Sequence, residues 1–129
     1  MENNELQQIM VTAQTWVDGK LIDAETKAQV KALMEAEDKT ELIDSFYRTL
    51  EFGTGGLRGI MGPGTNRMNK YIVAQATQGY ANYLLKVQRE NGYTKPVEQV
   101  SVVVGHDCRN NGRMFAETVA NIFSANGIK

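Results

Sequence analysis

The residues best suited to chemistry lie in a glycine-rich segment between Gly53 and Gly64, which holds half of the chain's twelve glycines. Glycine reaches positive φ without a steric penalty and lacks a Cβ, so such a run lets backbone N–H groups approach a ligand closely. Thr54 adds a hydroxyl, and Arg58 adds a fixed positive charge beside the same backbone. This combination is suited to binding a phosphate group.

The segment does not match either of the standard nucleotide-binding loops. Counted from Gly53, the pattern Gly-x-Gly-x-x-Gly has Arg58 where it needs its third glycine, and nothing matches Gly-x-x-x-x-Gly-Lys-Ser/Thr. Composition alone also fits a glycine-rich turn that only joins two elements. Two functions stay open on this basis: a free-standing phosphate- or nucleotide-binding module, and a helical interaction protein in which the segment is a linker.

Two motifs, in the right order and correctly separated, resemble those of a known enzyme family. Residues 52–59, Phe-Gly-Thr-Gly-Gly-Leu-Arg-Gly, resemble the N-terminal signature of the phosphoglucomutase/phosphomannomutase (α-D-phosphohexomutase) family. The continuation over 60–69 is similar to the subgroup of phosphopentomutase-like phosphoglucomutases. Residues 102–109 resemble the family's strand followed by Gly-x-Asp-x-Arg. By this resemblance the chain is an N-terminal fragment of such an enzyme.

The resemblance implies a phosphosugar mutase, which moves a phosphoryl group between C1 and the terminal hydroxyl of an α-phosphosugar. The implied route passes through a phosphoserine enzyme and a bisphosphorylated intermediate, with Mg²⁺ as cofactor and a sugar bisphosphate as activator. Arg58 matches the motif arginine beside the phosphoserine, and Thr54, Gly55 and Gly56 shape the same pocket. Arg109, in the second motif, is a further phosphate-binding candidate.

The nucleophile and metal loops of the family are absent from these 129 residues. In the family the nucleophile belongs to a Thr-x-Ser-His-Asn sequence. None of the serines of this chain is directly followed by a histidine; they are Ser45, Ser101 and Ser124. The metal loop needs aspartates at alternate positions, and the chain has no such pair. We therefore expect the fragment alone to be inactive, with the missing loops beyond Lys129.

Composition and charge exclude several other classes of protein. The chain is 42% hydrophobic and 22% charged, which is ordinary for a globular protein, and no apolar run approaches the ~20 residues of a membrane span. Residues 51–129 hold nine Lys/Arg and five Asp/Glu, a positive excess too dilute for nucleic acid. A single cysteine, Cys108, agrees with a reducing compartment. We predict a cytoplasmic protein that binds a phosphosugar and neither nucleic acid nor membrane.

Residues 1–50 are predicted to form a helical N-terminal leader. Apolar residues recur there at three-and-four spacing in three short stretches, which is the pattern of helices with one buried stripe. Asp23 is predicted to cap the second helix, and Asp38 with Glu41 has the capping-box spacing at the start of the third. The stripes must pack against one another or against a later domain.

Residues 51–129 are predicted to be the first part of the family's N-terminal α/β domain. After the glycine segment, Asn69 is expected to cap a long amphipathic helix that ends near Gly92. Tyr80 and Tyr83 fall on the apolar face of this helix, so they are predicted to belong to the core rather than to a ligand site.

The β-branched run over residues 100–104 is predicted to form a strand covered on both faces. A loop and a helix over about 113–125 follow, and Ile128 and Lys129 would begin the next strand. The predicted fold class is α/β: an incomplete three-layer α/β/α first domain with a mixed sheet, preceded by the helical leader. An incomplete layer predicts self-association through its unpaired strand edge.

Overall fold

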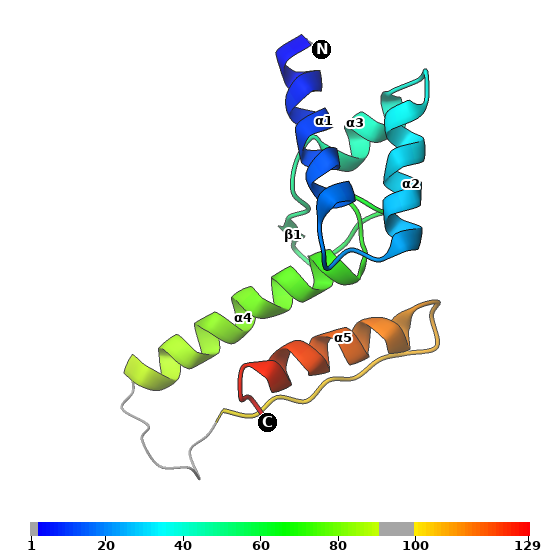
Figure 1. Cartoon of the computed structure of the whole chain (residues 1–129). Coiled ribbons are helices and arrows are strands. Elements are labelled where there is room, and N and C mark those ends of the chain that lie inside the picture. Colours follow the sequence, from blue (N-terminus) through cyan, green and yellow to red (C-terminus); the bar gives the residue numbers. More distant parts are fainter. Residues whose placement is uncertain (1–2, 91–99) are drawn as a thin grey trace. The chain divides into compact units, whose positions relative to one another are not determined.

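The computed structural model describes residues 3–90 and 100–129, and Figure 1 shows their helices and strands. The elements are α1 (Asn3–Asp18), α2 (Ala24–Glu35), α3 (Thr40–Phe46), β1 (Phe52–Gly53), β2 (Gly56–Leu57), α4 (Lys70–Glu90) and α5 (Gly112–Ala125). The chain divides into two compact units, with the boundary between Asn69 and Lys70. Within the described residues, no helix has both the length and the apolar character needed to cross a membrane.

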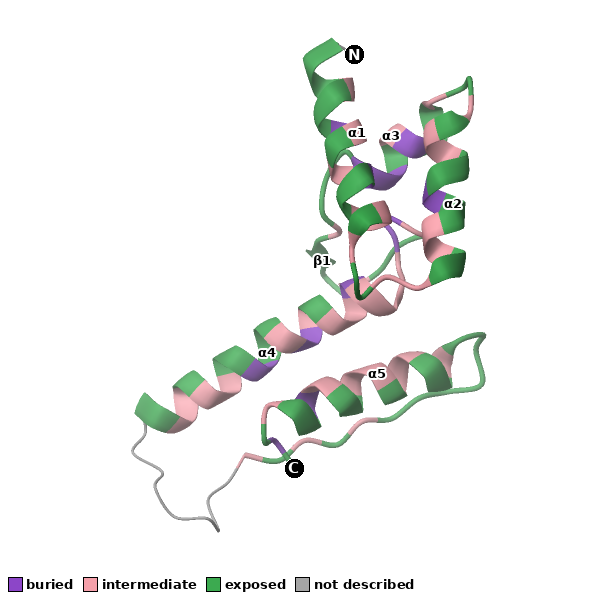
Figure 2. Ribbon diagram, viewed as in Figure 1, coloured by how far each residue is buried: buried purple, intermediate pink, exposed green. Residues whose placement is uncertain are grey.

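The first unit has a core made by the inner faces of α1, α2 and α3. In Figure 2 the buried positions of these helices lie on the sides that face one another. Trp16 contacts the edge of Phe46 with ring centroids 5.6 Å apart, an arrangement that aromatic pairs favour. The buried residues are Ile9, Ala13, Val30, Leu42 and Phe46. The predicted helical leader is therefore confirmed, and its stripes pack against one another.

One of the two predicted helix caps is present. The Asp23 carboxylate accepts a hydrogen bond from the Thr26 N–H at 2.7 Å, which satisfies a free donor in the first turn of α2. The predicted capping box of α3 is wrong, because the cap position is taken by Lys39 and not by Asp38. The Asp38 side chain instead accepts from the N–H and the hydroxyl of Thr40, two residues on. Asp38 therefore makes local Asx-type hydrogen bonds instead of the hydrogen bonds of a capping box.

The glycine segment forms a hairpin followed by a looped return to the helices. Phe52 pairs with Leu57 and Gly53 with Gly56 in antiparallel register, which leaves Thr54 and Gly55 as the turn. Farther along, an isolated parallel bridge joins Met61 to Met68 and closes the loop between them.

Gly64 is the glycine whose missing side chain the packing requires most. Its φ is +126°, and a Cβ built there would lie 2.4 Å from the Ser45 carbonyl oxygen of α3. By contrast, a Cβ on Gly55 would meet nothing within 4 Å, and Gly55 is not among the glycines with positive φ. The two glycines thus differ in what an added methyl group must displace.

We expect Gly64→Ala to lower the free energy of unfolding of the first unit by about 2 to 5 kcal/mol, since backbone strain and overpacking add. Gly55→Ala, the matched control, should change it by less than about 0.5 kcal/mol. Urea denaturation followed by the fluorescence of Trp16, the single tryptophan, measures both. Equal unfolding midpoints for the two variants would show that the contact with Ser45 is not tight in solution.

The second unit packs α4 against α5 around a small apolar core of Ala81, Phe123 and Ile128. Helix α5 ends in a Schellman motif: the Gly127 N–H donates to Ser124, and the Ile128 N–H donates to Phe123 at 2.9 Å. Gly127 has φ +74°, as this helix end requires, and the predicted stop at this glycine is confirmed. The predicted end of α4 near Gly92 lies outside the described residues.

The valine segment, residues 100–104, was predicted to be a strand but has no strand assignment in the described structure, and only one of its faces is covered. Val100, Val102 and Val104 pack on the core, whereas Val103 is 99% exposed, so the expectation of two covered faces is wrong. The described residues supply helices on one side only.

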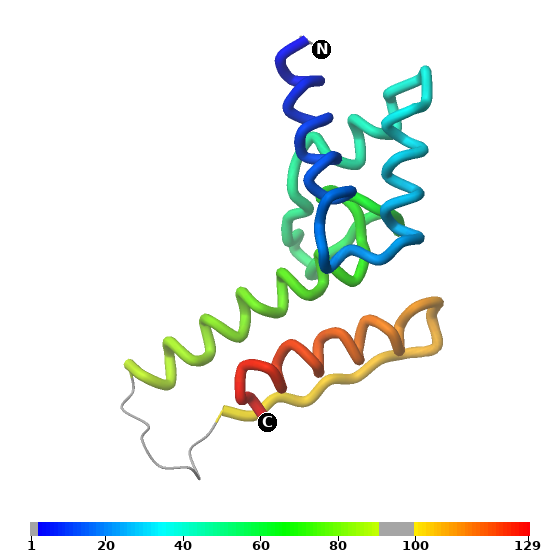
Figure 3. Tube along the Cα trace, in the orientation of Figure 1, coloured from blue at the N-terminus to red at the C-terminus, as the bar shows by residue number. Residues whose placement is uncertain are grey.

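The Lys129 N–H donates to Val100, and the Val102 N–H donates to Lys129, which is the bonding of a parallel pair. Figure 3 shows the C-terminus returning beside the start of this segment. Self-association through its other edge stays a prediction.

Tyr80 and Tyr83 are also placed differently from the prediction. Their exposed fractions are 53% and 60%, so they are not core residues of the described structure. The buried residues of α4 are Ile72, Thr77 and Ala81. Tyr80 and Tyr83 therefore lie at the edge of the buried face of this helix. Tyr80 keeps one edge contact with Phe123, at a centroid distance of 5.9 Å.

The division into compact units does not coincide with the predicted domain boundary after residue 50. Residues 51–69 are tied to α3 by several long-range hydrogen bonds, so they fold with the helices that precede them. The Leu50 N–H donates to Thr65, and the Asn66 N–H donates to Ser45 at 2.9 Å. The helical leader thus supports the glycine segment directly.

Candidate functional site

Arg58 directly follows β2 and is not engaged by the described part of the chain. Its side chain is exposed and makes no hydrogen bond or ion pair with any described residue. Thr54, Gly55 and Gly56 lie on the same short hairpin, so four of the five predicted site residues are neighbours. A guanidinium in this state has all of its N–H donors available for an anion.

The space beside the hairpin turn is open. A Cβ built on Gly55 or Gly56 would meet no atom within 4 Å, so packing among the described residues does not require glycine at either position. Gly56 has φ +103°, a conformation that side chains rarely adopt. Its backbone can therefore turn tightly, and no described atom packs against the position where a side chain would begin.

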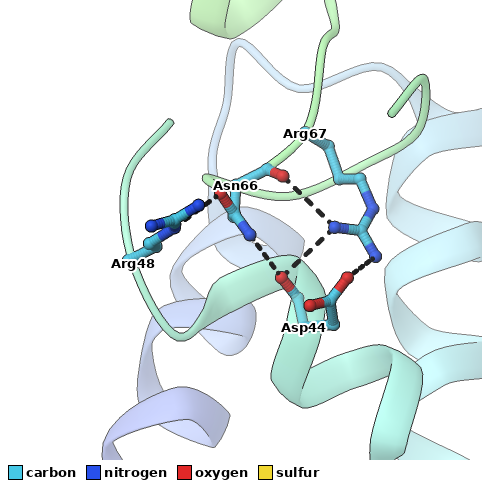
Figure 4. A network of polar contacts seen from close by, with 4 residues as sticks. All are labelled: Asp44, Arg48, Asn66 and Arg67. Atoms are coloured by element: carbon cyan, nitrogen blue, oxygen red, sulfur yellow. Dashed lines mark hydrogen bonds and ion pairs between the residues drawn. The ribbon is translucent and has the colours of Figure 1, made fainter. Parts of the chain in front are cut away.

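A second arginine, Arg67, lies just after the glycine segment; both of its Nη atoms are hydrogen-bonded and its side chain is only 7% exposed (Figure 4). Its Nη2 lies 2.7 Å from the Asp44 Oδ2, and its Nη1 donates to the backbone carbonyls of Asp44 and Asn66 at 3.2 Å. The Asn66 amide also donates to the Asp44 carbonyl, at 2.9 Å, and accepts from Arg48. These bonds join α3 to the loop that follows the hairpin.

A surface cavity of about 680 Å³ lies next to this network, but its charges do not suit a phosphate. Its lining includes the carboxylates of Asp38, Glu41 and Asp44, while Arg67 is its single cationic residue and is already paired with Asp44. Carboxylates this close to a phosphate would repel it. The hairpin is thus a better anion site than the neighbouring cavity.

Sequence reasoning did not identify Arg67, Asn66 or Asp44 as parts of one site. Their bonds connect residues 22 and 23 positions apart, so no short spacing marks them. The sequence offered one signal: Asn66 and Arg67 are adjacent polar residues beside a glycine-rich and apolar run. Two such side chains need hydrogen-bond partners when they are buried.

The second motif forms an exposed loop before α5, in the other compact unit. The Asp107 carboxylate accepts from the backbone N–H of Arg109 at 3.0 Å and from its Nε at 2.8 Å. These two bonds lower the pKa of Asp107, the backbone bond contributing most. The geometry supports Asp107 as a loop-shaping residue. Arg109 is 87% exposed and, among the residues that the structure describes, pairs only with Asp107 at the surface, so its phosphate-binding role stays a prediction.

We expect Arg109→Ala to raise the pKa of Asp107 only part of the way to its ordinary value. The backbone N–H, which is the larger cause, survives the substitution. Because the folded pKa is the lower one, this bonding stabilises the loop above the ordinary aspartate pKa and is lost as pH falls through the folded value. An NMR titration of the Asp107 carboxyl carbon tests this, and full recovery of the ordinary pKa would assign the shift to the guanidinium instead.

The described residues do not provide a metal site. No group of three or more His, Cys, Asp or Glu side chains is placed to hold an ion in residues 3–90 and 100–129. Magnesium in proteins takes oxygen ligands, usually one or two carboxylates with the substrate and water. Residues 3–90 and 100–129 thus offer no cluster of ligands to which Mg²⁺ can be assigned.

Curated relatives of the chain are mutases of phosphorylated sugars. It is 37% identical over 107 residues to a probable phosphoribomutase of Schizosaccharomyces pombe, covering 83% of this chain and 17% of the relative. A phosphomannomutase of Mycoplasma genitalium is 31% identical over 122 residues, 95% of this chain and 20% of the relative. A phosphoglucomutase of Staphylococcus epidermidis is 32% identical over 108 residues, 84% and 18% respectively. The chain thus spans at most a fifth of the length of these relatives.

A family model assigns most of the chain. Residues 49–129 match α/β/α domain I of phosphoglucomutase/phosphomannomutase, which confirms the predicted α/β fold class and the resemblance seen in the two motifs. No solved structure matches the chain significantly. The match begins at the base of the glycine hairpin and includes the valine segment and its loop. The chain therefore belongs to the phosphoglucomutase/phosphomannomutase family.

Proposed function

We propose that this chain is the N-terminal part of a phosphosugar mutase that moves a phosphoryl group between C1 and the terminal hydroxyl of an α-phosphosugar. The route is a phosphoserine enzyme with a bisphosphorylated intermediate, for which a sugar bisphosphate serves as activator. Relatives named as mutases of phosphoribose, phosphomannose and phosphoglucose support a phosphosugar substrate. Family membership favours this over a free-standing phosphate- or nucleotide-binding module or a helical interaction protein.

The observation that carries the proposal is the difference between Arg58, in the glycine segment, and Arg67, just after it. Arg67 is buried and bonded to α3, whereas Arg58 is exposed, unpaired within the described residues and adjacent to an open hairpin turn. Arginine binds phosphate oxygens through two parallel N–H bonds, and Arg58 is the arginine of the segment with those donors free. We assign Arg58 to the transferring phosphoryl group.

Thr54, Gly55 and Gly56 complete the proposed phosphate site around Arg58. The turn exposes the Thr54 hydroxyl and the neighbouring backbone, and nothing among the described residues occupies the adjacent space. Arg109, in the other compact unit, is proposed separately as a phosphate-binding residue because it lies in the second motif that resembles the family's. No step is assigned to Mg²⁺ on this chain, because its described residues do not form a site for that ion.

The test is a coupled assay of the full-length protein with glucose 1-phosphate, mannose 1-phosphate and ribose 1-phosphate, with Mg²⁺ and the matching bisphosphate. We expect turnover of at least one of them, together with a phosphate-labelled serine that can be trapped on the enzyme. A folded full-length protein that isomerises none of the three and takes up no phosphate would exclude the proposal.

A further inference from the structure

The buried network around Arg67 connects to the backbone beside Arg58. Arg67 precedes Met68, whose N–H donates to the Ile60 carbonyl at 2.8 Å, and the Gly62 N–H donates back to Met68 at 3.2 Å. This bridge holds Ile60 two residues after Arg58. Fixing Arg67 on α3 therefore restrains the residues that lead directly out of the hairpin.

Leu50 provides a second restraint at the same place. A Cβ built on Gly59 would lie 2.8 Å from the Leu50 Cδ1, so the two residues are closely packed. The Leu50 N–H is itself bonded to Thr65 at 2.8 Å, within the loop that Arg67 anchors. The base of the hairpin is thus restrained from both sides, while a Cβ built on the turn residue Gly55 would meet no atom within 4 Å.

We propose that Arg67, fixed by Asp44, is a positioning residue that orders the hairpin base and so aims Arg58 at the transferring phosphoryl group. This rests on the function proposed above for Arg58. The donors of Arg67 that face Asp44 and Asn66 are occupied, so it acts through the backbone and not on the substrate. A misplacement of about 1 Å at a reacting group lowers the rate by about 100-fold, so loosening this network should reduce turnover.

The test compares three substitutions in the full-length protein: Arg67→Met, Arg67→Lys and Asp44→Asn. We expect Arg67→Met to lower kcat by about 10- to 100-fold and to change KM by less than about threefold. Arg67→Lys should recover part of kcat, since lysine keeps the charge and loses the planar two-pronged contact. Asp44→Asn should have the smallest effect, because it retains the backbone carbonyl that accepts from Arg67.

Hydrogen exchange by mass spectrometry on peptides covering residues 50–69 gives a readout independent of activity. Arg67→Met should speed exchange there, including the amides of Gly62 and Met68, and leave α4 and α5 unchanged. Arg89→Met is the matched control, because Arg89 is an exposed arginine near the end of α4. It should leave kcat and exchange over 50–69 as in the wild type.

A folded Arg67→Met protein with kcat within about twofold of the wild type would overturn the proposal, even if its melting temperature fell. If Arg67→Met does not fold, normal kcat in both Arg67→Lys and Asp44→Asn would overturn it equally. If the wild type has no mutase turnover, the proposed function fails separately. Exchange over residues 50–69 then decides the inference: faster exchange in Arg67→Met supports it, and unchanged exchange contradicts it.

Discussion

Purified residues 1–129 should give no measurable turnover of glucose 1-phosphate, mannose 1-phosphate or ribose 1-phosphate, even with Mg²⁺ and a sugar bisphosphate. A phosphoserine route needs a serine hydroxyl that a neighbouring base activates. Ser45 is buried against Gly64, and none of the three serines is directly followed by the single histidine, His106. The described residues also lack a group of metal ligands. Without a nucleophile, the predicted site residues of this chain can at most bind a phosphate group; we do not expect them to transfer it.

A coupled assay of the chain beside the full-length protein measures this difference. The full-length protein serves as the positive control for the coupling enzymes and for the activator. Turnover by residues 1–129 that survives repurification and disappears in Arg58→Ala would show that a complete site lies within the chain. In that case the nucleophile must be a group other than a serine next to a histidine.

Features set by neighbouring residues were predictable from the sequence. The three helices of the leader follow from apolar spacing, and the Asp23 cap follows from its position before α2. The end of α5 at Gly127 follows from the need for a left-handed residue in that turn. In each case the determining contacts span no more than a few positions along the chain.

Features set by distant partners were not predictable in the same way. Tyr80 and Val103 are apolar enough for a core, but whether they are covered depends on elements that no local pattern specifies. The bond between Arg67 and Asp44 spans 23 positions and leaves no periodic signal. Exposed apolar residues on α4 and the valine segment are surfaces that further elements can cover.

The glycine segment contains both a feature that the sequence predicted and a feature that it did not. Its glycine content correctly indicated a bend with close approaches, but not which glycine serves which purpose. Gly64 is needed by the described packing because Ser45 lies against it, whereas Gly55 faces open space. The same residue type therefore supports the fold at one end of the segment and leaves room for a ligand at the other.

In the full-length protein, if it has the proposed mutase activity, Arg58→Ala should lower kcat by about 100-fold or more while KM changes far less. A charge-assisted hydrogen bond contributes roughly 1.5 to 3 kcal/mol, and donors beside a transferring group contribute most when charge develops in the transition state. The melting temperature should stay unchanged, because Arg58 makes no hydrogen bond or ion pair with any residue of the described part of the chain. Steady-state kinetics and thermal melts on the same preparations provide both measurements.

Arg58→Lys should fall between the wild type and Arg58→Ala, since lysine keeps the charge and presents it at a single point. Arg67→Ala is the contrasting control: removing that buried side chain takes away the donor of the Asn66 carbonyl and of the Asp44 carboxylate, and leaves the Asp44 carbonyl with only its bond from Asn66. We expect it to lower the melting temperature, which Arg58→Ala should not do. If Arg58→Ala instead lowers the melting temperature and leaves kcat as it was, Arg58 supports the loop, and the phosphoryl group must be bound by another residue.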